Sequence, residues 1–176
     1  MFRETTKLVP RDQFISAMRQ VASSVTVVTT DGGAGRFGAT VSAFSSVSAD
    51  PPTVLICLFA ESRISKAVIE NAAFCVNVLS EKDSDVADRF AGRHDTWVDD
   101  RFSGIDCYGT PGTPPQIDGA TAFRCTVQQT VRSGSHLIVL GHVRDVLPGA
   151  SSPLTYHDGS YHRVRPTAKQ VLSVAN

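Results

Sequence analysis

The sequence predicts a mainly β protein: an antiparallel barrel with a few short peripheral α-helices. Three observations predict this class. Short runs rich in β-branched and aromatic residues recur along the chain, turn dipeptides separate several of them, and strands and helices do not alternate regularly. A chain of 176 residues can bury roughly 70% of its unfolded surface without metals or disulfides. We therefore expect a single domain with a core over about residues 12–163 and less ordered terminal tails.

The first 60 residues predict a helix, a hairpin and a buried strand. Asp12 is expected to cap a helix whose apolar residues recur at helical spacing: Phe14, Ile15, Met18, Val21 and Ala22. The β-branched run Val25–Thr30 and the glycine-rich turn after it predict a hairpin with the segment that follows. The run Thr53–Phe59 is apolar on both faces, so we expect a central strand covered on both sides.

The middle of the chain predicts two short helices around a strand. Ser62 is expected to cap the first helix, and Phe74–Leu79 reads as the strand after it. Ser80 and Asp83 resemble a capping box, which opens a second helix that ends at Gly92. Residues 93–118 have few periodic apolar positions and predict a long loop.

The last third predicts two hairpins. Phe123–Arg132 alternates strictly, with its odd-numbered residues on one face, which is typical of a strand with one face in water. A turn at Ser133-Gly134 leads into a second long strand, His136–Leu147. The runs LTYH and SYHRV then pair around Asp158-Gly159, a dipeptide favoured in tight hairpin turns.

Composition excludes several classes of function. Lys plus Arg and Asp plus Glu number 17 each, so no global field favours nucleic acid or an anionic membrane, and any anion site must be local. No apolar run approaches ~20 residues, and the first residues lack a signal-peptide core, so we expect a soluble cytoplasmic protein. The glycine clusters do not match the dinucleotide-fold or P-loop patterns.

The cysteines and histidines do not predict a metal site. Cys57, Cys75, Cys107 and Cys125 lie far apart and form no CxxC pair. His136 and His142 share a face of one predicted strand but would lie about 20 Å apart at ~3.3 Å per residue. We therefore expect no metal cofactor.

A hydroxyl-rich segment, GATVSAFSSVSADPP at Gly38–Pro52, is the most informative part of the chain. It carries Thr40, Ser42, Ser45, Ser46 and Ser48 just before the apolar run. Uncharged donors and acceptors beside an apolar strand suit a flat ligand with a polar rim, such as a flavin ring. A serine-rich strand edge with a turn is the alternative interpretation.

A second polar cluster, Glu61–Lys66, directly follows the apolar strand. If a helix begins at Ser62, its free N–H groups, the hydroxyls of Ser62 and Ser65, and the charges of Arg63 and Lys66 converge on one end. That arrangement predicts a phosphate site. A capped helix with a solvated basic turn is the alternative.

A third feature is the tripeptide Gly134-Ser135-His136, at a junction between a turn and a strand. This position can expose the imidazole at the mouth of a barrel, although many lone histidines are only surface or core groups. Near the C-terminus Tyr156 and Tyr161 add an aromatic rim that could stack on a ring or simply finish the edge of the barrel.

In order and spacing these segments resemble the short flavin reductases, the reductase components of two-component flavin monooxygenases. The resemblance runs from about Phe14 to Tyr161 through VTVVTT, FGATVSAFSSVSADPPTVLICL, SRISKAVIENAAFCVNVLS, DRFAG, GSHLIVLGHV and PLTYHDGSY. It implies a split antiparallel β-barrel with short peripheral helices, a homodimer, FMN or FAD bound near the subunit interface, and NADH or NADPH as co-substrate.

The resemblance also implies site residues. They match the segments that in this family lie near the flavin ring, the ribityl chain and the phosphate, at the edge of the flavin pocket and at the closing strand. These residues are Thr40, Val41, Ser42, Ala43, Ser45, Ser46, Ser62, Arg63, Ser65, Lys66, Phe90, Ala91, Gly92 and Tyr161. The GSH motif places His136 beside the nicotinamide and makes it the candidate catalytic residue. The loop Arg93–Pro115 varies in such proteins, so it does not predict which pyridine nucleotide is used.

The sequence therefore predicts an NAD(P)H:flavin oxidoreductase that passes a hydride from nicotinamide C4 to flavin N5 and releases reduced flavin to a separate oxygenase. The cofactor carries the chemistry and the protein chiefly positions two rings, which agrees with the lack of an acid–base triad. Two alternatives remain open: a non-catalytic flavin-binding or sensor protein, and a split-barrel oxidase of a phosphorylated vitamin.

Overall fold

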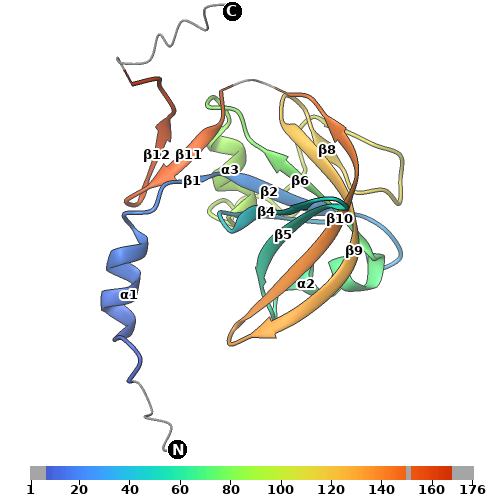
Figure 1. Ribbon diagram of the computed structural model, residues 1–176. Helices are drawn as coiled ribbons and strands as arrows, with labels where there is room; N and C mark the ends of the chain where they lie inside the picture. Colours follow the sequence, from blue (N-terminus) through green and yellow to red (C-terminus); the bar gives the residue numbers. More distant parts are fainter. Residues whose placement is uncertain (1–6, 150–151, 168–176) are drawn as a thin grey trace, which may run out of the picture.

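The computed structural model describes residues 7–149 and 152–167 of the chain (Figure 1). The predicted terminal tails fall largely on residues 1–6 and 168–176, which lie outside the described residues.

Seven antiparallel strands form the main sheet. Their order is β3 (Phe37–Val41), β2 (Thr26–Thr30), β6 (Ala73–Val78), β9 (Thr121–Ser133), β10 (His136–Leu147), β5 (Pro52–Phe59) and β4 (Phe44–Ala49). The two edge strands, β3 and β4, are consecutive in the chain, and β3 also contacts β5, so the sheet curls until its edges meet. Because no ladder joins these edges, the barrel is split, and the predicted fold class is confirmed.

Two apolar clusters stabilise this arrangement. The first fills the barrel and includes the fully buried side chains of Val28, Ile56, Phe74 and Val139. The second lies outside the barrel wall, where Phe90 and Phe102 pack edge to face with ring centroids 4.9 Å apart. The second cluster joins the barrel to the long loop and to a small three-stranded sheet of β1 (Ser23–Ser24), β11 (Leu154–His157) and β12 (Ser160–Arg163).

The two helices beside the barrel are α2 (Arg63–Asn71) and α3 (Ser84–Phe90). Ser62 caps α2, as predicted, and Ile64 is buried beneath the helix. One half of the predicted capping box before α3 is present, because the Asp83 carboxylate accepts a hydrogen bond from the backbone N–H of Ser80 at 3.0 Å. The other half is not: the Ser80 hydroxyl accepts from the N–H of Lys82 at 3.4 Å and not from that of Asp83, and the helix begins only at Ser84. Burial raises the pKa of the Asp83 carboxyl.

Helix α1 (Arg11–Met18) projects away from the barrel (Figure 1). It is present as predicted, but Asp12 is not its cap. The helix begins at Arg11, two residues earlier than a cap at Asp12 predicts, so Asp12 lies in its first turn. It ends at Met18, so Val21 and Ala22 lie beyond it. No residue of α1 is buried, and the apolar side chains of Phe14 and Met18 face solvent.

Strand β5 has one buried and one open face. Val54, Ile56 and Leu58 point into the barrel, while Leu55, Cys57 and Phe59 are only partly buried or exposed. The strand lies next to the edge strand β4. The prediction of a strand inside the sheet is confirmed, since β5 lies between β10 and β4. Its predicted cover on both sides is wrong for the described residues of the single chain, because the outward-facing residues remain partly or largely exposed.

A β-bulge changes the faces of β9. The register passes from Gln129 opposite Leu140 to Val127 opposite Gly141, so Gln128 is an extra residue. The predicted strict alternation is consequently wrong beyond Val127. Thr130 lies opposite the fully buried Val139, whereas Val131 is 43% exposed.

Most remaining elements agree with the sequence. The β2–β3, β9–β10 and β11–β12 hairpins form as predicted, the last with Asp158 and Gly159 at positive φ. The loop over 93–118 contains one short strand pair, β7 (Cys107–Tyr108) with β8 (Gln116–Ile117), and the side chains of Phe102 and Ile117 anchor it in the second apolar cluster. Within the described ranges, no helix is long and apolar enough to cross a membrane.

Candidate functional site

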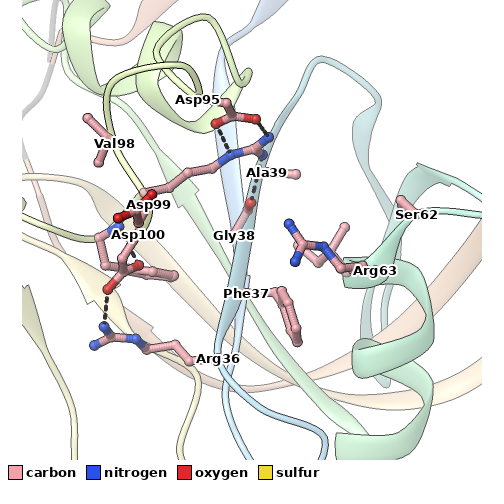
Figure 2. Close-up of a pocket in the computed structure, with 13 residues that line it drawn as sticks. Arg36, Phe37, Gly38, Ala39, Ser62, Arg63, Asp95, Val98, Asp99 and Asp100 are labelled. Atoms are coloured by element: carbon pink, nitrogen blue, oxygen red, sulfur yellow. Dashed lines mark hydrogen bonds and ion pairs between the residues drawn. The ribbon is translucent and has the colours of Figure 1, made fainter.

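A cavity of about 540 Å³ lies between strand β3, the beginning of α2 and the loop over 95–102 (Figure 2). Phe37, Gly38 and Ala39 of β3 form one wall, and Ser62 and Arg63 another. Gly38 is required where it stands: a Cβ there would lie 2.5 Å from the ring of buried Phe90. The close approach of β3 to α3 thus shapes the back of the cavity.

Three arginines line this cavity, and two of them are engaged by the loop. Arg101 makes paired hydrogen bonds to the Asp95 carboxylate at 2.9 and 2.6 Å and also donates to the carbonyl of Phe90 at 3.0 Å. Arg36 pairs with Asp100 at 2.8 Å. The Arg101 hydrogen bond lowers the pKa of Asp95, so this carboxylate stays charged.

Arg63 differs from the other two arginines. Among the described residues, no carboxylate lies within ion-pair distance of it, and its guanidinium lies 5.8 Å from the centre of the Phe37 ring. Figure 2 shows its side chain extending from α2 into the space beside Phe37. Arg63 acts on the Asp95 carboxylate only from beyond ion-pair distance, where its charge helps to lower the pKa of Asp95. A guanidinium without an ion pair at the N-terminus of a helix is suited to an anionic group, because charge and helix dipole act in the same direction.

The hydroxyls at this helix end serve the fold. Ser62 Oγ accepts from the N–H of Ser65 at 3.3 Å and donates to the carbonyl of Phe59 at 2.7 Å. Ser65 is fully buried, and its hydroxyl is directed at the carbonyls of Ala60 and Ser62. Lys66 is exposed and does not line the cavity. Of the four predicted phosphate contacts, the structure thus brings Ser62 and Arg63 to the cavity.

The hydroxyl-rich segment runs from β3 into β4. Thr40 donates to the carbonyl of Ala87 in α3 at 2.6 Å, and Val41 packs against the barrel core. Ser42 and Ala43, between the strands, line a second cavity of about 430 Å³ that is bounded by Tyr156 and the apolar side of α1. Ser45 and Ser46 are exposed on β4.

The residues predicted at the edge of the pocket lie behind the first cavity. Phe90 is buried against Phe102, and Ala91 ends α3 in an exposed position. Gly92 has φ of 81°, and a Cβ there would lie 2.6 Å from the Arg101 guanidinium. This short segment therefore supports the wall made by Arg101.

Tyr161 and His136 lie apart from the first cavity. The Tyr161 hydroxyl donates to Asp88 of α3 at 2.7 Å, and burial together with this bond raises its pKa to about 12. His136, the first residue of β10, is exposed, with Nδ1 3.0 Å from the hydroxyl of Ser135. Its exposure at a turn agrees with the predicted location.

Sequence reasoning missed the loop residues of the first cavity. Arg36, Asp95, Asp100 and Arg101 carry the pairing that leaves Arg63 free. The charged residues in the sequence WVDDRF were the only sign that this loop could contribute to a site. Asp100 and Arg101 of this run contact Arg36 and Gly38, more than 60 residues earlier in the chain, and only the fold brings these residues together.

A family model described as "Flavin reductase like domain" matches residues 18–165. The chain belongs to the flavin reductase family. It is 33% identical over 159 residues to an FMN reductase (NADH) RutF of Variovorax paradoxus, covering 89% of this chain and 87% of that protein. A Rhizobium meliloti protein named "Probable flavin reductase" is 38% identical over 85% of this chain, which spans about half (48%) of that relative's length.

Solved structures show the same flavin reductase fold. Flavin reductase PheA2 in its native state superposes with a TM-score of 0.80 at 28% identity, covering 90% of this chain and 100% of that one. The NADH:FAD oxidoreductase SgcE6 of Streptomyces globisporus C-1027, in complex with NAD and FAD fragments, gives a TM-score of 0.81 at 29% identity, covering 93% and 99%.

The chemistry of the donor set in this family member fits a flavin. Arg63 offers an unpaired cation for phosphate, and the segment Thr40–Ser46 offers small, uncharged side chains beside exposed backbone at the split of the barrel. The two cavities lie along the same strand: Phe37 and Ala39 of β3 line the first, and Ser42 and Ala43, directly after the end of β3, line the second.

Proposed function

We propose that this chain is an NADH-dependent flavin reductase that transfers a hydride from reduced nicotinamide to flavin and releases the reduced flavin. The observation that carries the proposal is Arg63, which has no ion-pair partner among the described residues and stands at the capped beginning of α2, across the cavity from Phe37, Gly38 and Ala39 of β3. Family membership supports it. FMN and FAD remain alternatives, because one relative is named for FMN and one structural neighbour for FAD.

The flavin, when bound, supplies the electron-accepting chemistry: the C4–H bond of the nicotinamide breaks, its hydride goes to flavin N5, and a solvent proton completes the reduced flavin. The residues of this chain bind and orient. Arg63, Ser62 and the α2 N-terminus would hold the phosphate, whereas Ser65 and Lys66, also predicted as contacts, lie outside the cavity. Ser42 and Ala43, with Ser45 and Ser46 of β4, would contact the ring and ribityl chain, and His136 would contact the nicotinamide. Thr40 and Val41, whose side chains contact α3 and the barrel core, would support this segment.

One assay tests the activity. Purified protein is mixed with NADH or NADPH and with free FMN, FAD or riboflavin, and the loss of nicotinamide absorbance is followed. We expect multiple turnovers with NADH and at least one flavin, and dialysis is expected to remove the flavin, because micromolar affinity, about 8 kcal/mol, permits exchange between turnovers. Flavin binding without turnover would instead identify a sensor.

Reduced flavin is proposed to pass to a separate oxygenase. Structural neighbours support this step, since one is titled the flavin reductase component of a bacterial two-component tryptophan halogenase and another the flavin reductase of a styrene monooxygenase. The cytoplasmic location expected from the sequence belongs to the same proposal.

The protein is further proposed to be a homodimer. Two apolar surfaces in the single chain support a second copy as their cover: the exposed side of α1, with Phe14 and Met18, and the outer face of the sheet at Leu55, Ile138 and Leu140. Because the α1 side also lines the cavity with Ser42 and Ala43, we expect Met18→Glu to weaken both self-association, measured by analytical ultracentrifugation, and flavin binding.

A further inference from the structure

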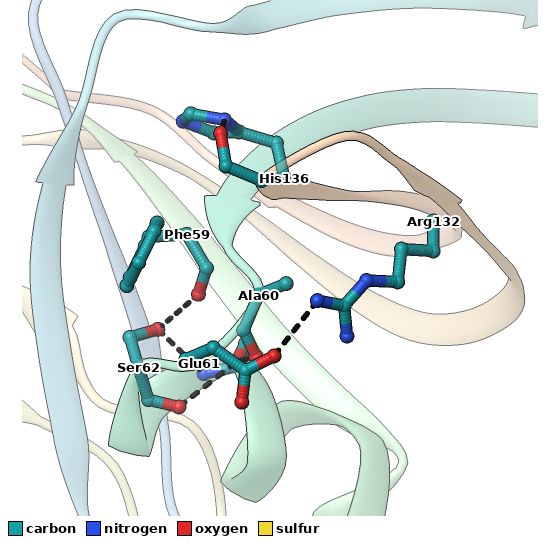
Figure 3. A network of polar contacts seen from close by, with 8 residues as sticks. Phe59, Ala60, Glu61, Ser62, Arg132 and His136 are labelled. Carbon is teal, nitrogen blue, oxygen red and sulfur yellow. Dashed lines mark hydrogen bonds and ion pairs between the residues drawn. The ribbon is translucent and has the colours of Figure 1, made fainter.

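Phe59 and His136 meet at one end of the barrel. Phe59 is the last residue of β5 and His136 the first of β10, and the antiparallel register places them directly opposite each other. Their ring centroids lie 6.2 Å apart with an interplanar angle of 78°, an edge-to-face arrangement (Figure 3). Aromatic pairs prefer this geometry, so the Phe59 ring restricts the orientation of the imidazole.

The turn that carries His136 is fastened to the end of β5. The N–H of Ala60 donates to the carbonyl of Ser135 at 3.0 Å, and Arg132 pairs with Glu61 at 2.8 Å (Figure 3). The Ser135 hydroxyl lies 3.0 Å from Nδ1 of His136, which leaves Nε2 as the ring nitrogen without a partner among the described residues. The backbone and one side-chain pair thus set where the imidazole stands, and Phe59 sets which way its plane faces.

The same residue also supports the flavin side of the site. The carbonyl of Phe59 accepts from both the N–H of Ser62 at 3.0 Å and the Ser62 hydroxyl at 2.7 Å, which fixes the cap of α2 next to Arg63. The side chain contacts His136, and the main chain holds the helix end. Phe59 therefore connects the two half-sites that hydride transfer must align.

The exposure of Phe59 has no explanation in the stability of the barrel. Its neighbour Leu58 is 2% exposed and packs inside, whereas the Phe59 side chain is 54% exposed and belongs to neither apolar cluster. An exposed aromatic ring at a candidate site is instead suited to contact a ligand or to orient a residue that does.

We propose that Phe59 is a positioning residue for hydride transfer: its ring holds the His136 imidazole in the plane from which Nε2 reaches the nicotinamide. The inference rests on the proposed function of His136. Phe59→Leu removes the aromatic pair and is expected to raise KM for NADH roughly three- to tenfold. The affinity for flavin is expected to stay unchanged, because the backbone carbonyl at position 59 remains.

The experiment compares the single variants Phe59→Leu, Phe59→Tyr and His136→Ala with the double variant that carries both Phe59→Leu and His136→Ala. Steady-state kinetics give kcat and KM for NADH, and quenching of flavin fluorescence gives the affinity for FMN. Val146→Ala is the matched control, because Val146 is 53% exposed near the far end of the same strand β10. We expect Phe59→Tyr and the control to behave as wild type, and Phe59→Leu to add nothing in the His136→Ala background, since it acts through the imidazole.

A second readout does not depend on activity. The ring current of Phe59 shifts the proton resonances of the His136 imidazole, and we expect Phe59→Leu to move these resonances in the NMR spectrum while the other histidines stay unchanged. The role of Phe59 would be overturned if these resonances did not move. It would also be overturned if Phe59→Leu raised KM for NADH by the same factor in the His136→Ala background as in the wild type.

The outcomes separate the two levels of the proposal. If the wild type turns over no NADH with any flavin, the proposed function fails. If it does, but His136→Ala leaves the NADH kinetics unchanged, the roles of His136 and Phe59 both fail while the reductase activity stands. If only Phe59→Leu is without effect, the Phe59 inference alone is wrong.

Discussion

Replacing Arg63 by alanine tests the phosphate site directly. Arg63 is the cavity arginine with no carboxylate partner among the described residues, so its removal takes away a charge without breaking an ion pair of the fold. A charge-assisted contact to phosphate is worth ~1.5 to 3 kcal/mol, and each 1.4 kcal/mol corresponds to about tenfold in affinity. Since Arg63 is exposed, we take the lower end and expect about a tenfold weaker affinity for FMN.

The assay measures the dissociation constants of FMN and riboflavin by flavin fluorescence at fixed ionic strength. Riboflavin has no phosphate, so its affinity is expected to stay within about twofold of wild type in the same variant. Arg63→Lys keeps the charge and is expected to retain most of the FMN affinity. Lys82→Ala, which removes an exposed cation from the turn before α3, is the matched control and should change neither ligand.

Raising the salt concentration gives an independent check, because screening weakens an exposed charge contact. The FMN affinity of the wild type should fall with salt more steeply than that of Arg63→Ala. Equal losses for FMN and riboflavin in Arg63→Ala would refute the phosphate assignment and leave Arg63 with a structural role only.

Three further predictions concern the scaffold. Asn77 is fully buried, and its side chain hydrogen-bonds to Val27, Thr29 and Ile117 and to the Cys75 thiol, so Asn77→Ala is expected to lower the free energy of unfolding by about 2 to 4 kcal/mol in urea denaturation, and a loss below 1 kcal/mol would contradict this. Gly38→Ala would place a Cβ 2.5 Å from the buried Phe90 ring, and we expect a loss of about 1 to 3 kcal/mol in the same experiment. Burial and the hydrogen bond to Asp88 raise the pKa of Tyr161 to about 12, above the ordinary value of about 10 for a tyrosine. The folded state therefore keeps this proton where the unfolded state loses it, so the stabilisation by the bond to Asp88 is complete below pH 10 and declines between pH 10 and 12, a decline that Tyr161→Phe should lack in pH-dependent unfolding.

The local elements follow from the sequence because their signals are local. The β-branched run at 25–30, the Asp158-Gly159 turn and the Ser62 cap each depend on residues within a few positions, and each forms as predicted. The motif order was also sufficient to predict the family and the split barrel, which the fold and the family match confirm.

Where a prediction is wrong, a partner distant in sequence or an inserted residue decided the outcome. The bulge at Gln128 reverses the faces of β9 after Val127, because the register is fixed by β10 and not by the alternation within the strand.

The sequence by itself determined the strands, the turns, the family and the residue types that a flavin requires, since these depend on short-range patterns. Only the tertiary structure decided which arginine is free to bind an anion. Arg36 and Arg101 form ion pairs with Asp100 and Asp95 of the long loop, while Arg63 forms none with the described residues. The same folding places Phe59 against His136, 77 positions later in the chain, because antiparallel pairing joins residues whose separation no local pattern encodes.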